Sequence, residues 1–156
     1  MRTAPLGEQK REPAAHWKVV CEGHSELIYI DQLGGKIHGT TYKAYNAKGG
    51  DLTNIRQETE NRSKQGQTIV IMDVDNNDIE EIRRFRKWCE GKKIKLLISN
   101  PSFEVWLLMH YQNVSPSMDQ YGLEHALDRY VTRGRYEKSK GIRVNKALID
   151  GAVERA

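Results

Sequence analysis

The chain contains no apolar run approaching the ~20 residues that are needed to span a bilayer. Its first residues also lack the apolar core of a signal peptide, so we expect a cytoplasmic protein without a membrane partner. There are only two cysteines, Cys21 and Cys89, and neither has a partner at a metal-binding spacing. This predicts buried thiols rather than a disulfide framework or a zinc site. A glycine-rich phosphate-binding loop is missing too, so any ATPase activity has to come from another protein.

The bulk composition is that of a globular protein. The 156 residues suffice for one compact domain, and 38% of them are hydrophobic. A net charge of +4 and a pI near 9.0 mildly favour a polyanionic partner. Residues 1–15 are polar and without periodicity, which predicts a flexible lead-in. Residues 16–156 are expected to form a single domain that ends in a basic, helical region.

Apolar runs alternate with helical patterns along the chain. Short apolar runs predict buried strands at His16–Cys21, 67–75 and Ile94–Ser99, and an alternating pattern predicts a weaker strand at 40–51. Helical spacing appears between these strands and after the last one. Asn77 or Asp78 is a suitable cap for the helix that ends at Gly91, and Asn100 and Pro101 for the helix that follows. His110, on the apolar face of that helix, is expected to be a core histidine.

This alternation predicts an α/β fold, a three-layer domain with about four mostly parallel strands flanked by helices. Ligands of such sheets bind beyond the carboxyl ends of the strands. The three clearest strands end in Glu22, in Asp73 and Asp75, and in Ser99 and Asn100. A strand order of 2-1-3-4 would bring Glu22 beside the two aspartates.

Asp73 and Asp75 project to the same side of a strand end, because side chains two apart in a strand share a face. Two such close carboxylates repel each other unless a cation lies between them. Mg²⁺ or Mn²⁺ suits hard oxygen ligands, and Glu22 is a candidate third ligand. The alternative interpretation is structural: an Asp-x-Asp pair at a strand end also caps the helix that follows.

Three segments resemble the RloB family. They are CEGHSELIYIDQL (Cys21–Leu33), IVIMDVDNND (Ile69–Asp78) and SNPSFEVWLLMHY (Ser99–Tyr111). The resemblance implies a TOPRIM-like fold, which is the metal-binding domain of topoisomerases, bacterial-type primases and several nucleases. It also implies a role in bacterial anti-phage defence, or abortive infection, beside an ATPase partner.

The same resemblance assigns roles to single residues. It implies that Glu22 is a general acid or base or a metal ligand, and that Asp73 and Asp75 are the paired metal aspartates. Supporting roles fall to residues of the same three segments: Glu26, Asp78, Asn100 and Glu104. The chain departs from the family at His24, where an acid is common, and at Ser25, where threonine is common.

The segment from Arg133 to Lys146 carries six basic residues and one acid. As a flexible loop it would grip phosphates without reading sequence, and Tyr136 would stack on a base. A solvated surface loop is the equally open alternative. The candidate nucleic-acid-binding residues are Arg133, Arg135, Lys138, Lys140 and Arg143.

These observations favour a metal-dependent nuclease that acts on DNA or RNA, including transfer RNA, with Mg²⁺ or Mn²⁺ as cofactor. The alternative is a non-catalytic subunit that binds a nucleic acid or a nucleotide and regulates a defence complex. A homodimer also stays open, because the apolar helix Phe103–Tyr111 suits a dimer interface as well as a core.

Overall fold

A computed structural model describes residues 15–33, 40–48, 51–63, 67–74, 77–132 and 134–156. Most of the expected lead-in therefore lies outside the described residues. The chain forms, in order, β1 (Ala15–Cys21), α1 (His24–Leu33), β2 (Thr40–Asn46), α2 (Leu52–Ser63), β3 (Thr68–Asp73), α3 (Ile79–Gly91), β4 (Lys95–Ser99), α4 (Glu104–Met109), α5 (Gln120–Leu127), η1 (Asp128–Tyr130) and α6 (Lys146–Arg155).

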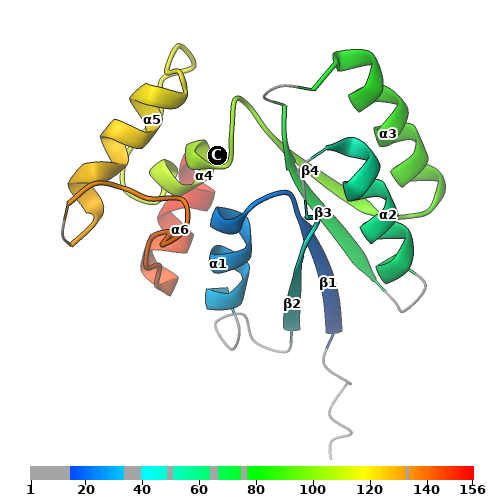
Figure 1. Ribbon diagram of the computed structural model, residues 1–156. Coiled ribbons are helices and arrows are strands. Elements are labelled where there is room, and N and C mark those ends of the chain that lie inside the picture. Colours follow the sequence, from blue (N-terminus) through cyan, green and yellow to red (C-terminus); the bar gives the residue numbers. More distant parts are fainter. Residues whose placement is uncertain (1–14, 34–39, 49–50, 64–66, 75–76, 133) are drawn as a thin grey trace, which may run out of the picture.

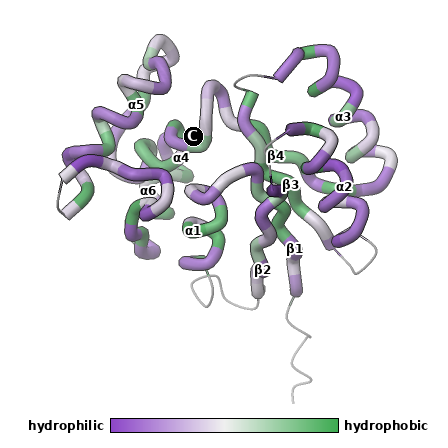
Figure 2. Tube along the Cα trace, viewed as in Figure 1, coloured by the Kyte–Doolittle hydropathy of each residue, from purple (hydrophilic) through white to green (hydrophobic). Residues whose placement is uncertain are grey.

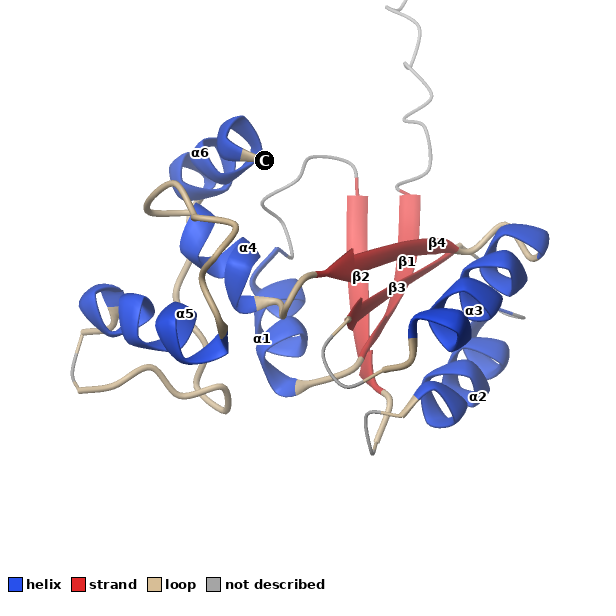
Figure 3. Ribbon diagram, turned by 90° about the horizontal axis from the view of Figure 1, so that it is seen from above, coloured by secondary structure: helices blue, strands red, loops and turns tan. Residues whose placement is uncertain are grey.

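The four strands form one sheet in the order β2-β1-β3-β4, and all neighbouring pairs are parallel. Helices α2 and α3 cover one face of the sheet, and α1 lies on the other (Figure 1). The C-terminal helices α4, α5 and α6 gather beyond α1, on its side of the sheet (Figure 3). This arrangement confirms the predicted three-layer α/β fold and the predicted strand order.

Alternation along the central strands divides the core into two parts. On one face of the sheet, Val20 and Val70 pack with Phe85 of α3. On the other face, Val19 and Ile71 pack with side chains of α1, α4 and the C-terminal region. All five of these side chains are at most 5% exposed. The apolar segments in the interior and the polar outer faces of α2 and α3 are visible in Figure 2.

The prediction that Ile94–Ser99 is a buried strand was wrong. β4 is an edge strand, and its Leu97 and Ile98 are 54% and 38% exposed. Ile94 itself precedes the strand and is buried. An apolar run predicts a strand but does not tell whether its faces will be covered, because that depends on where the strand lies in the sheet.

Asn100 and Pro101 do not begin the next helix as predicted. α4 starts at Glu104, after a turn in which the Ser102 carbonyl accepts a hydrogen bond from the Val105 amide. The Asn100–Pro101 peptide bond is cis, and Asn100 is exposed. The predicted start of α3 is confirmed, because the Asp78 carboxylate accepts a hydrogen bond from the Glu80 amide at 2.9 Å.

Among the described residues, no helix is both long and apolar enough to cross a bilayer.

Candidate active site

The carboxyl ends of β1 and β3 bring two of the predicted site residues together. Glu22 follows β1 directly, and its amide donates to the Ile71 carbonyl of β3 at 3.2 Å. Asp73 is the last residue of β3, and its amide donates to the Glu22 carboxylate at 2.7 Å. The contact that was inferred for the two strands is therefore present.

Two further acids complete this group. Glu26 lies in the first turn of α1 and is 3% exposed, and Glu104 opens α4 and is 1% exposed. Gly23 leaves room for the Glu26 carboxylate, because a Cβ atom there would lie 3.1 Å from the Glu26 Oε2 atom. We call the four acids, Glu22, Glu26, Asp73 and Glu104, the acidic edge.

The electrostatics of the acidic edge are those of crowded, buried carboxylates. Burial raises the pKa of Asp73 to about 8, with smaller upward contributions from the other three acids. Burial also raises the pKa of Glu26 to about 7, and the charges of Glu104 and Glu22 add to this effect. Such a site favours a cation, because a cation relieves both the repulsion and the loss of hydration.

One oxygen of the acidic edge is available to such a cation. Asp73 Oδ1 is buried and has no hydrogen-bond partner among the described residues. Buried polar atoms are nearly always paired, so an orphaned carboxylate oxygen fits a metal ligand. Asp75, the third predicted ligand, lies outside the described residues. Within the described ranges, no three acidic, histidine or cysteine side chains form a metal-binding group.

Glu104 is the centre of a buried hydrogen-bond network. Its Oε1 atom accepts from the hydroxyls of Ser25 at 3.3 Å and Tyr136 at 3.0 Å. Its Oε2 atom accepts from Ser102 at 2.7 Å and from the Gln120 amide at 3.4 Å. Burial alone would raise the pKa of Glu104, but the Ser102 hydrogen bond and nearby positive charge hold it below its ordinary value. Glu104 therefore stays ionised and joins α1 to the C-terminal region.

The described part of the basic C-terminal segment, Arg133 to Lys146, is packed against the rest of the fold. Tyr136 is only 7% exposed and directs its hydroxyl to Glu104, so the prediction that it stacks on a base was wrong. The Gln32 side chain donates to the Ile142 carbonyl at 2.7 Å. Gly141 has φ +60, and a Cβ there would lie 2.9 Å from the Ile28 Cγ2 atom, so glycine permits this close approach. The segment is thereby fixed against α1.

The basic side chains of this segment differ in what they reach. Lys138 lies beside the acidic edge, with Nζ 3.8 Å from Glu104 Oε1. Lys140 instead donates to Glu137 at 2.9 Å, on the surface. Arg135 and Arg143 are exposed, and Arg133 lies outside the described residues.

The remaining predicted residues have other surroundings. Asp78 caps α3 and is exposed. His110 is 2% exposed and is held by the Tyr29 hydroxyl at 3.1 Å and the Trp106 carbonyl at 2.8 Å, which confirms a core histidine. Asn100 lines a cavity beside the acidic edge.

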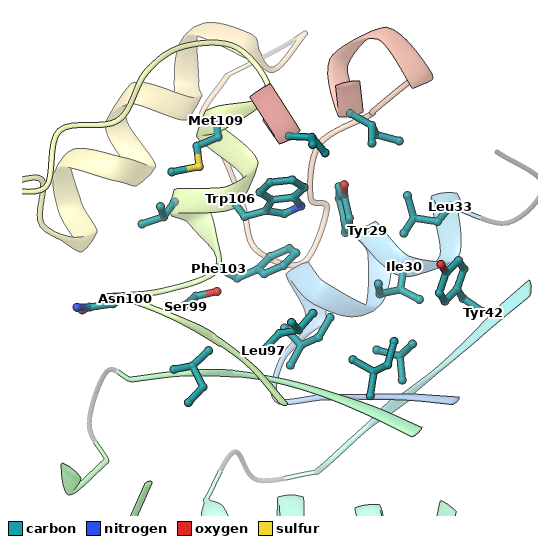
Figure 4. A pocket seen from close by; sticks show the side chains of 17 residues that line it. Tyr29, Ile30, Leu33, Tyr42, Leu97, Ser99, Asn100, Phe103, Trp106 and Met109 are labelled. Atoms are coloured by element: carbon teal, nitrogen blue, oxygen red, sulfur yellow. The ribbon is translucent and has the colours of Figure 1, made fainter. Parts of the chain in front are cut away.

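That cavity has a volume of about 590 Å³ and lies between the sheet and helices α1, α4 and α6 (Figure 4). Its walls are mainly apolar, with Tyr29 and Trp106 side by side, their ring centroids 6.3 Å apart in an edge-to-face arrangement, and with Leu97 of β4 at the sheet (Figure 4). Ser99 and Asn100, at the carboxyl end of β4, supply polar atoms at one side. Leu97, which is 54% exposed, lines this cavity.

Sequence reasoning missed the partners of Glu104, because three of them, Ser25, Gln120 and Tyr136, come from different parts of the chain. One signal was present for Glu104 itself. It is the only acid in an otherwise apolar helix, and an acid in that position needs buried partners.

The fold and the site together define a three-layer α/β protein with buried carboxylates at the carboxyl edge of a parallel sheet. The family model described as RloB-like protein matches residues 18–156, and the chain belongs to this family. No curated protein and no solved structure matches the chain.

Proposed function

We propose that the protein is a divalent-metal-dependent nuclease that cleaves phosphodiester bonds of DNA or RNA, including transfer RNA. The observation that carries this proposal is the orphaned, buried Asp73 Oδ1 atom among the carboxylates of the acidic edge. We further propose a TOPRIM-like mode of action and a role in anti-phage defence beside an ATPase partner, on the resemblance of the three sequence segments.

The proposed ligands of Mg²⁺ or Mn²⁺ are Glu22, Asp73 and Asp75. Asp73 and Glu22 are adjacent, and their oxygen ligands are of the type that both metals prefer. A bound ion would supply an activated water and neutralise charge on the phosphate.

The protein's own groups have three tasks in this proposal. Glu22 orients the attacking water and accepts its proton. Glu26 lies nearby, and its pKa of about 7 suits it to exchange a proton near neutral pH. Exposed cations, Arg135 and Arg143 among them, hold the backbone of the substrate. In the reaction, the oxygen of water bonds to phosphorus, one P–O ester bond breaks, and the leaving oxygen takes up a proton.

The experiment is cleavage of plasmid DNA and of total transfer RNA with Mg²⁺ or Mn²⁺. It compares the wild type with Glu22→Gln and Asp73→Asn, and with Asp150→Asn as matched control. Asp150 is an exposed acid of α6 that pairs with Lys146 at 2.8 Å. We expect the first two variants to lose at least about 100-fold in rate and the control to keep the wild-type rate. Thermal melts beside the assay show whether each variant is folded.

If Asp73→Asn cuts as fast as the wild type, or the wild type cuts neither polymer, the nuclease proposal is wrong. The non-catalytic subunit is the second candidate in that case. It predicts that the biological effect of the protein survives the Asp73→Asn substitution.

A further inference from the structure

Among the basic side chains of the C-terminal segment, Lys138 has a distinctive position. Its Nζ atom lies 3.8 Å from Glu104 Oε1 and 3.8 Å from Glu124 Oε1. Both distances exceed that of an ordinary hydrogen bond between these groups. Within the part of the chain that the structure describes, no hydrogen bond is formed by the Lys138 ammonium group.

Glu104 does not need Lys138 as a donor. A carboxylate has about four acceptor sites, and neutral donors from four residues already occupy those of Glu104. These donors are Ser25, Tyr136, Ser102 and Gln120. The N–H groups of the Lys138 ammonium are therefore available to another hydrogen-bond acceptor.

Lys138 is also held in place and open to solvent. Two residues before it, the Tyr136 amide donates to Asp128 Oδ1 at 2.6 Å, and the Tyr136 hydroxyl is bonded to Glu104. The Lys138 side chain is nevertheless 50% exposed, whereas that of Glu104 is 1% exposed. A substrate at the acidic edge can therefore reach the ammonium group.

The charge of Lys138 acts on three of the four carboxylates of the acidic edge, those of Asp73, Glu26 and Glu104. It opposes the upward shift in the pKa of Asp73 and of Glu26, so its field reaches both carboxylates. A cation at that position attracts an anionic group toward a site that is otherwise negative.

We propose that Lys138 contacts the phosphate at which cleavage takes place and neutralises a non-bridging oxygen of the phosphodiester. Lys138 keeps its proton throughout, and water supplies the atoms that are added. The inference rests on the proposed nuclease function. It distinguishes Lys138 from Lys140, which holds at most the distant backbone of the substrate.

The test measures kcat and KM for cleavage by the wild type, Lys138→Met, Lys138→Arg and Lys87→Met. Lys87 is the control, because it is an exposed cation of α3, on the face of the sheet opposite α1 (Figure 1). We expect Lys138→Met to lower kcat about 100-fold, as the loss of a charge-stabilising group does. Lys138→Arg should keep at least about a tenth of the wild-type kcat, since it retains the charge. Lys87→Met should leave kcat within about twofold, because exposed surface substitutions away from the site have little effect.

A Glu124→Gln variant separates this role from a structural one. If Lys138 mattered only as an ion-pair partner, the loss of Glu124 should lower kcat and the melting temperature as Lys138→Met does. If Lys138 binds the substrate, Glu124→Gln keeps kcat.

A Lys138→Met enzyme with wild-type kcat, or with a raised KM alone, overturns the assignment while the nuclease function stands. A wild type that cleaves neither polymer, or an Asp73→Asn variant that cleaves normally, removes the nuclease function and the role of Lys138 with it.

Discussion

The amide of Asp73 donates a hydrogen bond to the carboxylate of Glu22 at 2.7 Å, although the two residues are 51 positions apart in the sequence. The contact joins the carboxyl ends of β1 and β3, the two central strands of the sheet. It leaves Asp73 Oδ1 buried and without a partner among the described residues. Keeping the carboxylates of the acidic edge ionised therefore destabilises the folded, metal-free protein.

The metal-free protein should be more stable at pH 6.5 than at pH 8.5. The pKa values of Asp73 and Glu26 are raised to about 8 and about 7, so the folded state binds more protons than the unfolded state in this range. The contribution of these two groups to the free energy of unfolding is fully present below their ordinary pKa values near 4. It is lost as the pH rises through 7 to 8. We expect the melting temperature, measured in chelator by circular dichroism, to fall by roughly 3–6 °C between the two pH values.

The control is a variant with both Glu26→Gln and Asp73→Asn, which should melt at nearly the same temperature at both pH values. His110 has the opposite effect, because burial lowers its pKa and stability is then lost as the pH falls below its ordinary value of 6.5. The comparison therefore stays at pH 6.5 and above. A wild type that is more stable at pH 8.5 would contradict the description of the acidic edge.

Replacing Glu104 by alanine should destabilise the fold by about 2–4 kcal/mol. The substitution leaves the buried hydroxyls of Ser25, Ser102 and Tyr136 without their acceptor. Urea denaturation measures the change, with the exposed Glu137→Ala as control, which should stay within about 0.5 kcal/mol. Equal stability of both variants would show that the network does not hold the C-terminal region in place.

Alanine substitutions at two neighbouring positions on the same face of the sheet should differ strongly in how much they destabilise the fold. Ile71 and Leu97 are register partners, but Ile71 is 5% exposed and Leu97 is 54% exposed. We expect Ile71→Ala to cost about 2–5 kcal/mol and Leu97→Ala less than about 1 kcal/mol. A large loss for Leu97→Ala in chemical denaturation would mean that another surface covers the cavity beside β4.

The fold was largely predictable because its signals are local. Continuous apolar runs identified the central strands, and the need for contact between Glu22 and Asp73 led to the correct strand order. The exposure of β4 was not predictable, because its apolar sequence is also that of a central strand.

The candidate site was predictable only in part. Strand ends located Glu22 and Asp73, whose contact the structure describes. The position of Tyr136 was missed, because an aromatic residue in a basic segment is equally typical of a binding loop. Its burial depends on Glu104, an acid 32 positions earlier in the chain. Contacts between residues so far apart in the chain cannot be predicted from the spacing of residue types in the sequence.

The most direct test of the central claim is Mn²⁺ binding, measured by the loss of the free-ion electron paramagnetic resonance signal. The titration compares the wild type with Asp73→Asn and with Asp150→Asn, the exposed control on α6. We predict that the wild type and the control bind Mn²⁺ equally well and that Asp73→Asn binds it at least about 10-fold more weakly. Binding of equal strength by Asp73→Asn would contradict a metal site at the acidic edge.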